Sequence, residues 1–208
     1  MLAVTIPSSQ LQKHSLVFPG IRIKHHEQDW AFKTYILLSL VEDQFEEAVI
    51  ALSLYKPITR EEIVDHINSW FQDQTKYENR LRHMYAKMFV CAIDVIGKLL
   101  KIVCEDVKTP QKAVGAYQNF EQNFALAREI RNSVQHIEDR ARGLGRRSTP
   151  LDTKILLLGN FMNNKFCVTM ADGRTGGIEI SENIINEVKL TIQDVINAFE
   201  WEGPVFGR

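Results

Sequence analysis

The chain has 208 residues, of which 45% are hydrophobic and 25% are charged. This composition is typical of a globular domain and excludes a disordered chain. Its 25 Lys and Arg residues face 26 Asp and Glu residues, a formal net charge of −1, which excludes a uniformly basic nucleic-acid-binding coat. Three scattered cysteines without a CxxC motif exclude a disulfide framework and disfavour a zinc site, so we expect buried, reduced thiols.

Signals for a membrane or secretion are missing from the sequence. The longest apolar stretches fall short of the roughly 18–20 residues that cross a bilayer. The first residues, MLAVTIPSSQLQKH, do not place an apolar run after a basic region. We therefore expect a cytoplasmic protein with no membrane partner.

The first three quarters of the chain predict an extended arm followed by helices. Proline and glycine break any period in residues 1–28. The helical spacing of apolar residues, together with start signals, predicts three long helices, over about 29–55, 75–105 and 109–142. A shorter helix is predicted between the first two, from a capping box at Thr59 and Glu62 to about residue 71. Gly143 suits the position just past the end of the last of these helices.

The period changes after the loop GLGRRSTP. A hairpin that turns at Asn163-Asn164 is predicted from the runs ILLLGNF and KFCVTM, and IEI is a candidate third strand. Ser181 is predicted to start a last helix that ends near Phe199. The fold class is therefore mainly α: an up-and-down bundle of four to five helices with a small antiparallel β-hairpin before the C-terminal helix. We expect three segments, an N-terminal arm (1–28), a helical bundle (29–147), and the hairpin with the C-terminal helix packed on that bundle (148–208).

Positive charge is concentrated between residues 128 and 147. This stretch contains no lysine and three acidic residues, and its six arginines are Arg128, Arg131, Arg140, Arg142, Arg146 and Arg147. The guanidinium group is a planar fork of donors that suits phosphate. Cations at a solvated helix end would account for Arg140 and Arg142 equally well, but Arg128 and Arg131 lie well inside the predicted helix.

The same stretch holds a group of residues suited to phosphodiester cleavage. Asn132 and His136 are four residues apart and share a helix face, whereas Arg131 lies roughly 140° from His136 around an ideal helix. The two could meet because arginine is long, or across a two-fold interface. Arginine can stabilise a phosphorane, histidine can move protons near neutral pH, and RNA supplies its own 2′-hydroxyl nucleophile, so no metal would be required.

The sequence from Arg131 through Asn132 to His136, late in the last long helix of the bundle, resembles the Arg-x4-6-His motif of the HEPN superfamily. The resemblance covers about residues 29–143. It implies a homodimeric helical bundle and a metal-independent endoribonuclease, often a toxin with a cognate antitoxin protein or a defence effector. Residue by residue, it implies that Arg131 and His136 are catalytic and Asn132 is a polar positioning residue. We expect the remaining arginines of the stretch, Arg128, Arg140, Arg142, Arg146 and Arg147, to bind RNA.

The sequence is also compatible with several alternatives. The protein could be a non-catalytic dimerisation module that binds RNA, a nucleotide or an acidic partner. His136 could be a helix-surface residue bonded to Glu138 or Asp139, and Arg131 could pair with Glu129. The His25-His26-Glu27 cluster lacks helical ligand spacing, and Gly143-x-Gly145 is followed by Arg-Arg, unlike a P-loop. We therefore expect neither a metal nor a cofactor.

Overall fold

The computed structural model describes residues 13–55, 73–153, 155–162 and 164–207. In this part of the chain the α-helices are α2 (Gln28–Leu54), α4 (Asp73–Glu105), α5 (Gln111–Gln135), α6 (Ile137–Ala141) and α7 (Glu182–Asn197). Three of the predicted long helices are therefore present within a few residues of their expected starts. The helix predicted from the Thr59–Glu62 capping box lies outside the described residues.

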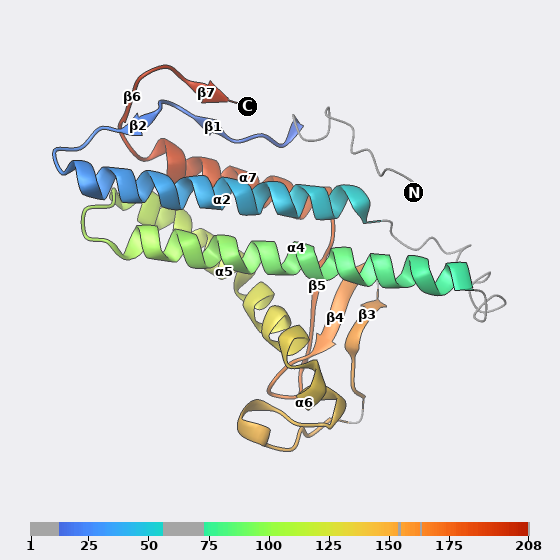
Figure 1. The fold of residues 1–208 in the computed structure, drawn as a ribbon. Coiled ribbons are helices and arrows are strands. Elements are labelled where there is room, and N and C mark those ends of the chain that lie inside the picture. The colour runs from blue at the N-terminus through green and yellow to red at the C-terminus, as the bar shows by residue number, and fades with distance from the viewer. Residues whose placement is uncertain (1–12, 56–72, 154, 163, 208) are drawn as a thin grey trace.

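Four of these helices form an up-and-down bundle (Figure 1). Helix α4 packs between α2 and α5, and α7 closes the ring against α5 and α2. The predicted mainly helical bundle with a small antiparallel sheet before the last helix is confirmed. Among the described residues, no helix is both long enough and apolar enough to cross a bilayer.

The centre of the core is helix α4. Phe89, Ile93, Ile96 and Leu100 are fully buried, because α2 and α5 contact this helix from two sides. The three- and four-residue spacing in the sequence predicts one buried stripe, formed by Leu81, Tyr85, Met88, Phe89, Ala92, Val95, Ile96, Leu99 and Val103. In the structure Met88 is exposed, whereas Ile93 and Leu100, outside this stripe, are buried. A helix contacted on two sides buries a wider arc of its surface than one stripe.

A three-stranded antiparallel sheet lies against the C-terminal half of α5 (Figure 1). Its strands are β3 (Leu158–Met162), β4 (Lys165–Thr169) and β5 (Thr175–Glu179), in the order β3-β4-β5. The turn between β3 and β4 includes Asn164 with φ of 60°, a left-handed conformation that asparagine tolerates. The predicted hairpin and third strand are thus confirmed, although residue 163 itself is outside the described part.

The N-terminal arm pairs with the C-terminal tail. Strand β1 (Val17–Phe18) is antiparallel to β7 (Phe206–Gly207), and β2 (Arg22–Ile23) is antiparallel to β6 (Trp201–Glu202). The strands of the arm and of the tail therefore lie side by side over α2 and α7 (Figure 1). The tail strands have only two residues each and were not predicted, since such short segments carry no periodicity.

The helix predicted to reach Arg142 is broken at His136, which corrects the expectation of one continuous helix. The backbone at His136 has φ of −109° and ψ of 40°, so α5 ends at Gln135 and α6 begins at Ile137. Contacts between α6 and β3 hold the short helix in its new direction. Gly143, with φ of 71°, follows the end of α6, as the sequence predicted.

The central position of α4 generates a stability prediction. We expect Ile93→Ala to lower the free energy of unfolding by about 2–5 kcal/mol, because it leaves a cavity among packed side chains. Ile102→Ala, at an exposed position of the same helix, is the matched control and should change it by about 0.5 kcal/mol or less. Urea unfolding followed by circular dichroism measures both, and equal effects would contradict the assignment of the core.

Candidate functional site

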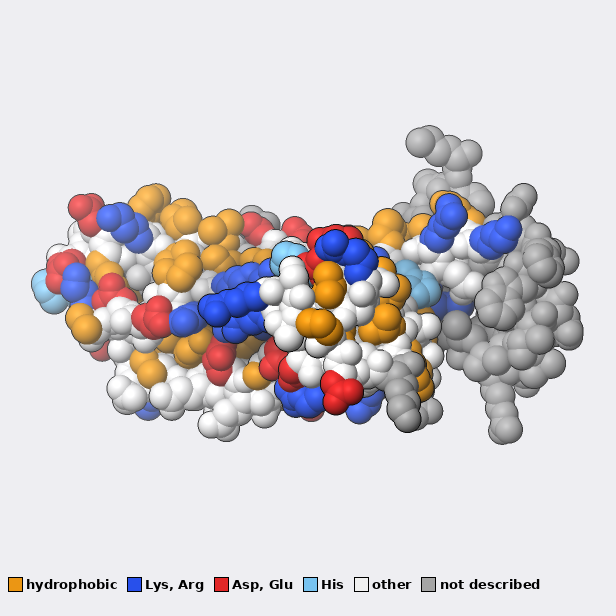
Figure 2. Space-filling view, turned by 90° about the horizontal axis from the view of Figure 1, so that it is seen from below, with side chains coloured by type: hydrophobic (Ala, Val, Ile, Leu, Met, Phe, Trp, Pro, Cys, Tyr) orange, Lys and Arg blue, Asp and Glu red, His pale blue; other side chains and the backbone are white. Residues whose placement is uncertain are grey.

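A cavity of about 610 Å³ lies at the break between α5 and α6. Its walls come from the end of α5, from α6, from the loop that follows α6 and from the β4–β5 turn at Ala171 and Asp172. A cavity of this volume is in the range of ligand-binding pockets. Seen from the side of α6 and this loop, the surface shows a gathering of Lys and Arg side chains (Figure 2).

The loop after α6 is a defined structure. The Leu144 N–H bonds to Asp139 O at 2.8 Å and the Gly143 N–H to Arg140 O at 2.9 Å, the paired bonds of a Schellman motif. A Cβ atom at Gly145 would collide with the carbonyl oxygen of Ala171, so this position requires glycine. These contacts hold the loop against the β4–β5 turn and close one side of the cavity.

The next residues of the loop are held in an unfavourable backbone conformation. Arg147 has φ of 55° and Ser148 has φ of 59°, and each such non-glycine residue costs on the order of 1–3 kcal/mol. Both Arg146 and Arg147 are exposed and line the cavity. Strain of this kind is frequent at ligand-binding positions, and the loop that carries it brings Arg146 and Arg147 to the cavity.

The three acidic residues of the cavity are each bound by an arginine from outside its lining, two arginines in all. Asp139 binds Arg142, and Asp172 and Glu129 both bind Arg174. The Arg174 hydrogen bond lowers the pKa of Asp172, so that carboxylate stays ionised and paired.

Neither Arg146 nor Arg147 has a carboxylate partner among the described residues. With the acids occupied by Arg142 and Arg174, these two cations are left uncompensated. The cavity therefore favours an anion.

Arg140 is the most unusual residue of the cavity. It is 4% exposed, and its Nη1 donates to the Leu144 carbonyl oxygen. Its Nε is buried without a hydrogen-bond partner, and no carboxylate pairs with it in the described part of the chain. A buried charge without a counter-ion is costly. An anionic ligand in the cavity would supply the missing counter-ion.

His136 and Asn132 complete the lining of the cavity. The His136 side chain is 60% exposed, and its Nδ1 lies 3.9 Å from Glu138 Oε1, while Nε2 has no partner among the described residues. Asn132 is exposed on the preceding turn of α5. An accessible imidazole thus stands beside the unpaired guanidinium groups, an arrangement suited to proton transfer at a bound phosphate.

The same region contains the residues best placed to hold a cation. Ligand atoms of His136, Glu138 and Asp139 lie within 4.8 Å of one another. However, Asp139 already accepts a 2.5 Å bond from Arg142. A metal ion would have to displace that guanidinium group, so these residues are better arranged for an ion pair than for a metal.

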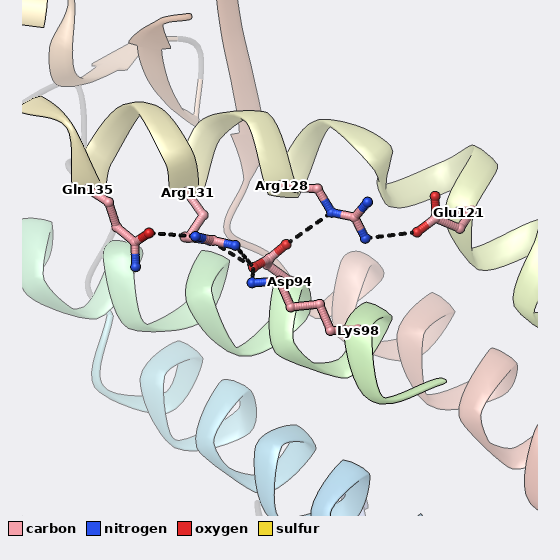
Figure 3. A network of polar contacts seen from close by, with 6 residues as sticks. All are labelled: Asp94, Lys98, Glu121, Arg128, Arg131 and Gln135. Atoms are coloured by element: carbon pink, nitrogen blue, oxygen red, sulfur yellow. Dashed lines mark hydrogen bonds and ion pairs between the residues drawn. The ribbon is translucent and has the colours of Figure 1, made fainter. Parts of the chain in front are cut away.

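Arg131 points away from this cavity and into the α4–α5 interface (Figure 3). Its Nε and Nη2 are each 2.7 Å from Asp94 Oδ2, and its Nη1 donates to Gln135 Oε1. Asp94 is 1% exposed and Arg131 is 16% exposed. The pairing with Glu129 that the sequence left open is not formed; the partner is a carboxylate 37 residues away on α4.

Two further cations share the Asp94 carboxylate. Lys98 Nζ is 2.6 Å from Oδ2, and Arg128 Nε is 3.5 Å from Oδ1. Arg128 also binds Glu121 at 3.1 Å. We call Asp94, Lys98, Glu121, Arg128 and Arg131 the Asp94 cluster (Figure 3). It joins α4 to α5 through side chains that carry three positive and two negative charges.

The structure therefore divides the residues predicted from sequence into two groups. The cavity brings together Asn132, His136, Arg140, Arg146 and Arg147. Arg128 and Arg131 belong to the Asp94 cluster, and Arg142 lies outside the lining, paired with Asp139.

Sequence reasoning missed two residues that organise these groups. Asp94 carries a visible signal, because it is the one acid in the apolar run MFVCAIDVIGKLL. Arg174 carries none, because its partner Glu129 is 45 positions earlier in the chain.

The thiols are as expected from the sequence. Cys91, Cys104 and Cys167 are free, and Cys104 and Cys167 are buried. Burial raises the pKa of Cys104 to about 12, which leaves it unreactive at neutral pH.

Comparisons with known proteins give no relative from which a function could be transferred. No family model, no curated protein and no solved structure matches the chain. A function must therefore be inferred from the geometry of the cavity and of the Asp94 cluster.

The Asp94 cluster generates a second stability prediction. Asp94→Asn should lower the free energy of unfolding by about 3 kcal/mol, because removal of one partner leaves buried cations uncompensated. Asp43→Asn, at an exposed position of α2, is the control and should have an effect of about 0.5 kcal/mol or less. Thermal and urea unfolding measure the difference; an Asp94 variant as stable as the control would show that the cluster does not hold α4 to α5.

Proposed function

We propose that this protein is a metal-independent endoribonuclease of the HEPN type, and that its active site is the cavity beside His136. The observation that carries the proposal is the buried Arg140 guanidinium, which has no carboxylate partner among the described residues and lines the same cavity as an accessible imidazole. RNA provides both things that this arrangement lacks, a phosphate anion and a hydroxyl nucleophile.

Arginines would bind the phosphate group of the substrate. Arg140 lies buried in the cavity wall, and Arg146 and Arg147 approach from the loop. Guanidinium groups can bind phosphate oxygens in pairs and stabilise the additional negative charge of a phosphorane. Asn132 on the neighbouring turn of α5 offers an amide that can orient the sugar or the phosphate.

His136 would move the proton in the cleavage step. The 2′-oxygen forms a bond to phosphorus, its proton passes to Nε2 of His136, and the bond from phosphorus to the 5′-oxygen breaks. The 5′-oxygen then takes a proton from water. The products are a 2′,3′-cyclic phosphate and a 5′-hydroxyl, and no metal takes part.

The proposal departs from the HEPN resemblance in the role of Arg131. Because Arg131 is bound to Asp94 and does not line the cavity, we assign the stabilisation of the phosphorane to Arg140 and the loop arginines. Arg131 then has a positioning role, since it fixes α5 one turn before His136. A homodimer, a cognate antitoxin, action as a toxin or defence effector, and a cytoplasmic location remain parts of the proposal that the resemblance and the sequence suggest.

A specific observation favours a second candidate function. The separation of Arg131 from His136 removes one half of the expected catalytic pair from the cavity. A module that binds RNA without cleaving it needs only Arg140, Arg146 and Arg147. The two functions differ in whether a product forms after binding.

Substitution of His136 tests the nuclease. We expect His136→Ala to lower the rate of RNA cleavage in EDTA by about 10²–10⁴-fold, the usual contribution of an acid–base catalyst, with RNA affinity and thermal stability nearly unchanged. His26→Ala is the control, because His26 is a highly exposed histidine of the arm. Denaturing gels of labelled RNA measure cleavage. Cleavage that survives in the His136 variant or needs added metal refutes the nuclease, and binding without any product identifies the second candidate.

Substitution of Arg140 tests the anion site, whichever of the two functions is correct. Arg140→Met should weaken RNA binding about tenfold or more, the value of a charged hydrogen bond, and should leave the melting temperature equal or higher, because a buried uncompensated charge is replaced by an apolar side chain. Arg22→Met, at an exposed arginine of β2 that pairs with Glu202 and does not line the cavity, should change neither quantity appreciably. Fluorescence anisotropy and calorimetry measure the two effects. A large loss of stability with intact binding would show that Arg140 serves the fold alone.

A further inference from the structure

We infer that a second phosphate subsite, formed by Lys98 and Arg128, extends the cavity along α5, so that the ligand is a single strand several nucleotides long. The inference rests on the proposed function, because it takes RNA as the ligand of the cavity beside His136. It predicts how long the bound RNA is and that this RNA is single-stranded. It also assigns a role to Lys98 that the sequence did not suggest.

The first observation is a second, smaller cavity next to the first. It has a volume of about 190 Å³ and is lined by Asp94, Glu121 and Arg128 of the Asp94 cluster together with apolar residues of α4 and α5. Lys98 is outside this lining but binds Asp94, which belongs to it. Glu129 lines this cavity and also the larger one. The two hollows therefore adjoin along the same side of α5.

The second observation is the charge of the Asp94 cluster. Lys98, Arg128 and Arg131 are balanced by only two carboxylates, those of Asp94 and Glu121. Glu129, which lies between the two cavities, is bound by Arg174 at 3.6 Å. One positive charge is thus left over within the Asp94 cluster, and Glu129, the acid between the two cavities, shares the Arg174 guanidinium with Asp172.

The third observation is that the cluster has free donors. The Lys98 ammonium group carries three N–H donors, and Asp94 is its one ion-pair partner among the described residues. Arg128 uses Nε and Nη2 toward Asp94 and Glu121, which leaves Nη1 without a partner in that part of the chain. These side chains are 44% and 39% exposed, so a phosphate oxygen can reach both. Arg131 is too buried to take part.

The distance between the two subsites sets the length of the ligand. Arg128 and Arg140 are twelve residues apart on α5 and α6, and because the chain turns at His136, the straight-helix rise of about 18 Å is an upper limit on their separation along the axis. A stacked strand advances roughly 3.4 Å per nucleotide, so the two subsites span at most about five nucleotides, and fewer of an extended strand. The smaller cavity, of about 190 Å³, has room for a phosphate group and not for a paired helix, which favours a single strand.

The experiment compares oligonucleotides of different lengths. Labelled 2′-O-methyl oligoribonucleotides of 2, 4, 6 and 8 nucleotides cannot be cleaved by attack of the 2′-oxygen, so fluorescence anisotropy reports binding alone. We expect affinity to rise with length up to about six nucleotides. Lys98→Met should leave the affinity for the dinucleotide unchanged, weaken that for the octanucleotide several-fold, and reduce the slope of log affinity against log salt by about 0.7, the value for one phosphate contact on a single strand.

Lys101→Met provides a matched control. Lys101 is one turn further along α4, is 46% exposed, and makes an i,i+4 ion pair with Glu105 as Lys98 does with Asp94, but Glu105 lines neither cavity, whereas Asp94 lines the smaller one. It should change neither the affinity nor the salt slope.

The possible outcomes distinguish failure of the second subsite from failure of the proposed function. If the wild-type protein binds the dinucleotide and Lys98→Met leaves the octanucleotide affinity unchanged, the second subsite is refuted and the proposed function stands. If the wild-type protein binds no length, both fail. An equal effect of Lys98→Met on a glutamate-rich peptide of the same charge would overturn the assignment to nucleic acid.

Discussion

The carboxylate of Asp94 is the only acid in the apolar run of α4, and it is shared by Lys98, Arg128 and Arg131. A buried carboxylate is tolerable only where cations compensate it, so α5 must present its arginines to α4 at this level. Gly97, one turn further along, lets the Phe120 ring pack against the backbone. Together these contacts fix the rotation and height of α5, and through it the place where α5 ends at His136. The cavity at that break therefore depends on an ion pair buried elsewhere in the bundle.

Around the cavity, the carboxylates are paired with arginines, whereas other arginines remain available to a ligand. Carboxylates around the cavity are occupied by Arg142 and Arg174, which lie outside it, whereas Arg140, Arg146 and Arg147 remain without carboxylate partners among the described residues. Two of these three guanidinium groups are held there at a cost, Arg140 by burial and Arg147 by a left-handed backbone. Unfavourable contributions of this kind persist where function requires them. A bound phosphate group would offset the cost of burying Arg140. Without an anion, the same charge that favours binding lowers the stability of the fold.

The net charge of −1 gives no hint of this arrangement, because the positive patch is local. The sequence showed that six arginines fall within twenty residues, but not that only Arg128 and Arg131 lie on the long helix while the other four follow its end. It did not show which of them would be neutralised. Arg131, the arginine of the motif, faces α4, while Arg140 and Arg146, further along the chain, share the cavity with His136. Helical spacing predicts the relative directions of side chains on α5. It does not apply to residues after His136, because the chain changes direction there.

Sequence periodicity by itself determined the helical class of the protein, the approximate limits of α2, α4 and α7, the hairpin, and the glycine that ends α6, because each depends on contacts or backbone preferences within a few residues. Tertiary structure alone decided the pairing of the arm with the tail, the width of the buried face of α4, the break at His136, and the partners of Arg131 and Arg174. Each of these depends on groups distant in the chain, such as Asp94 for Arg131 and Glu129 for Arg174. A local pattern shows which side chains can form an ion pair or a cavity wall, and only packing of the whole bundle brings their partners into reach.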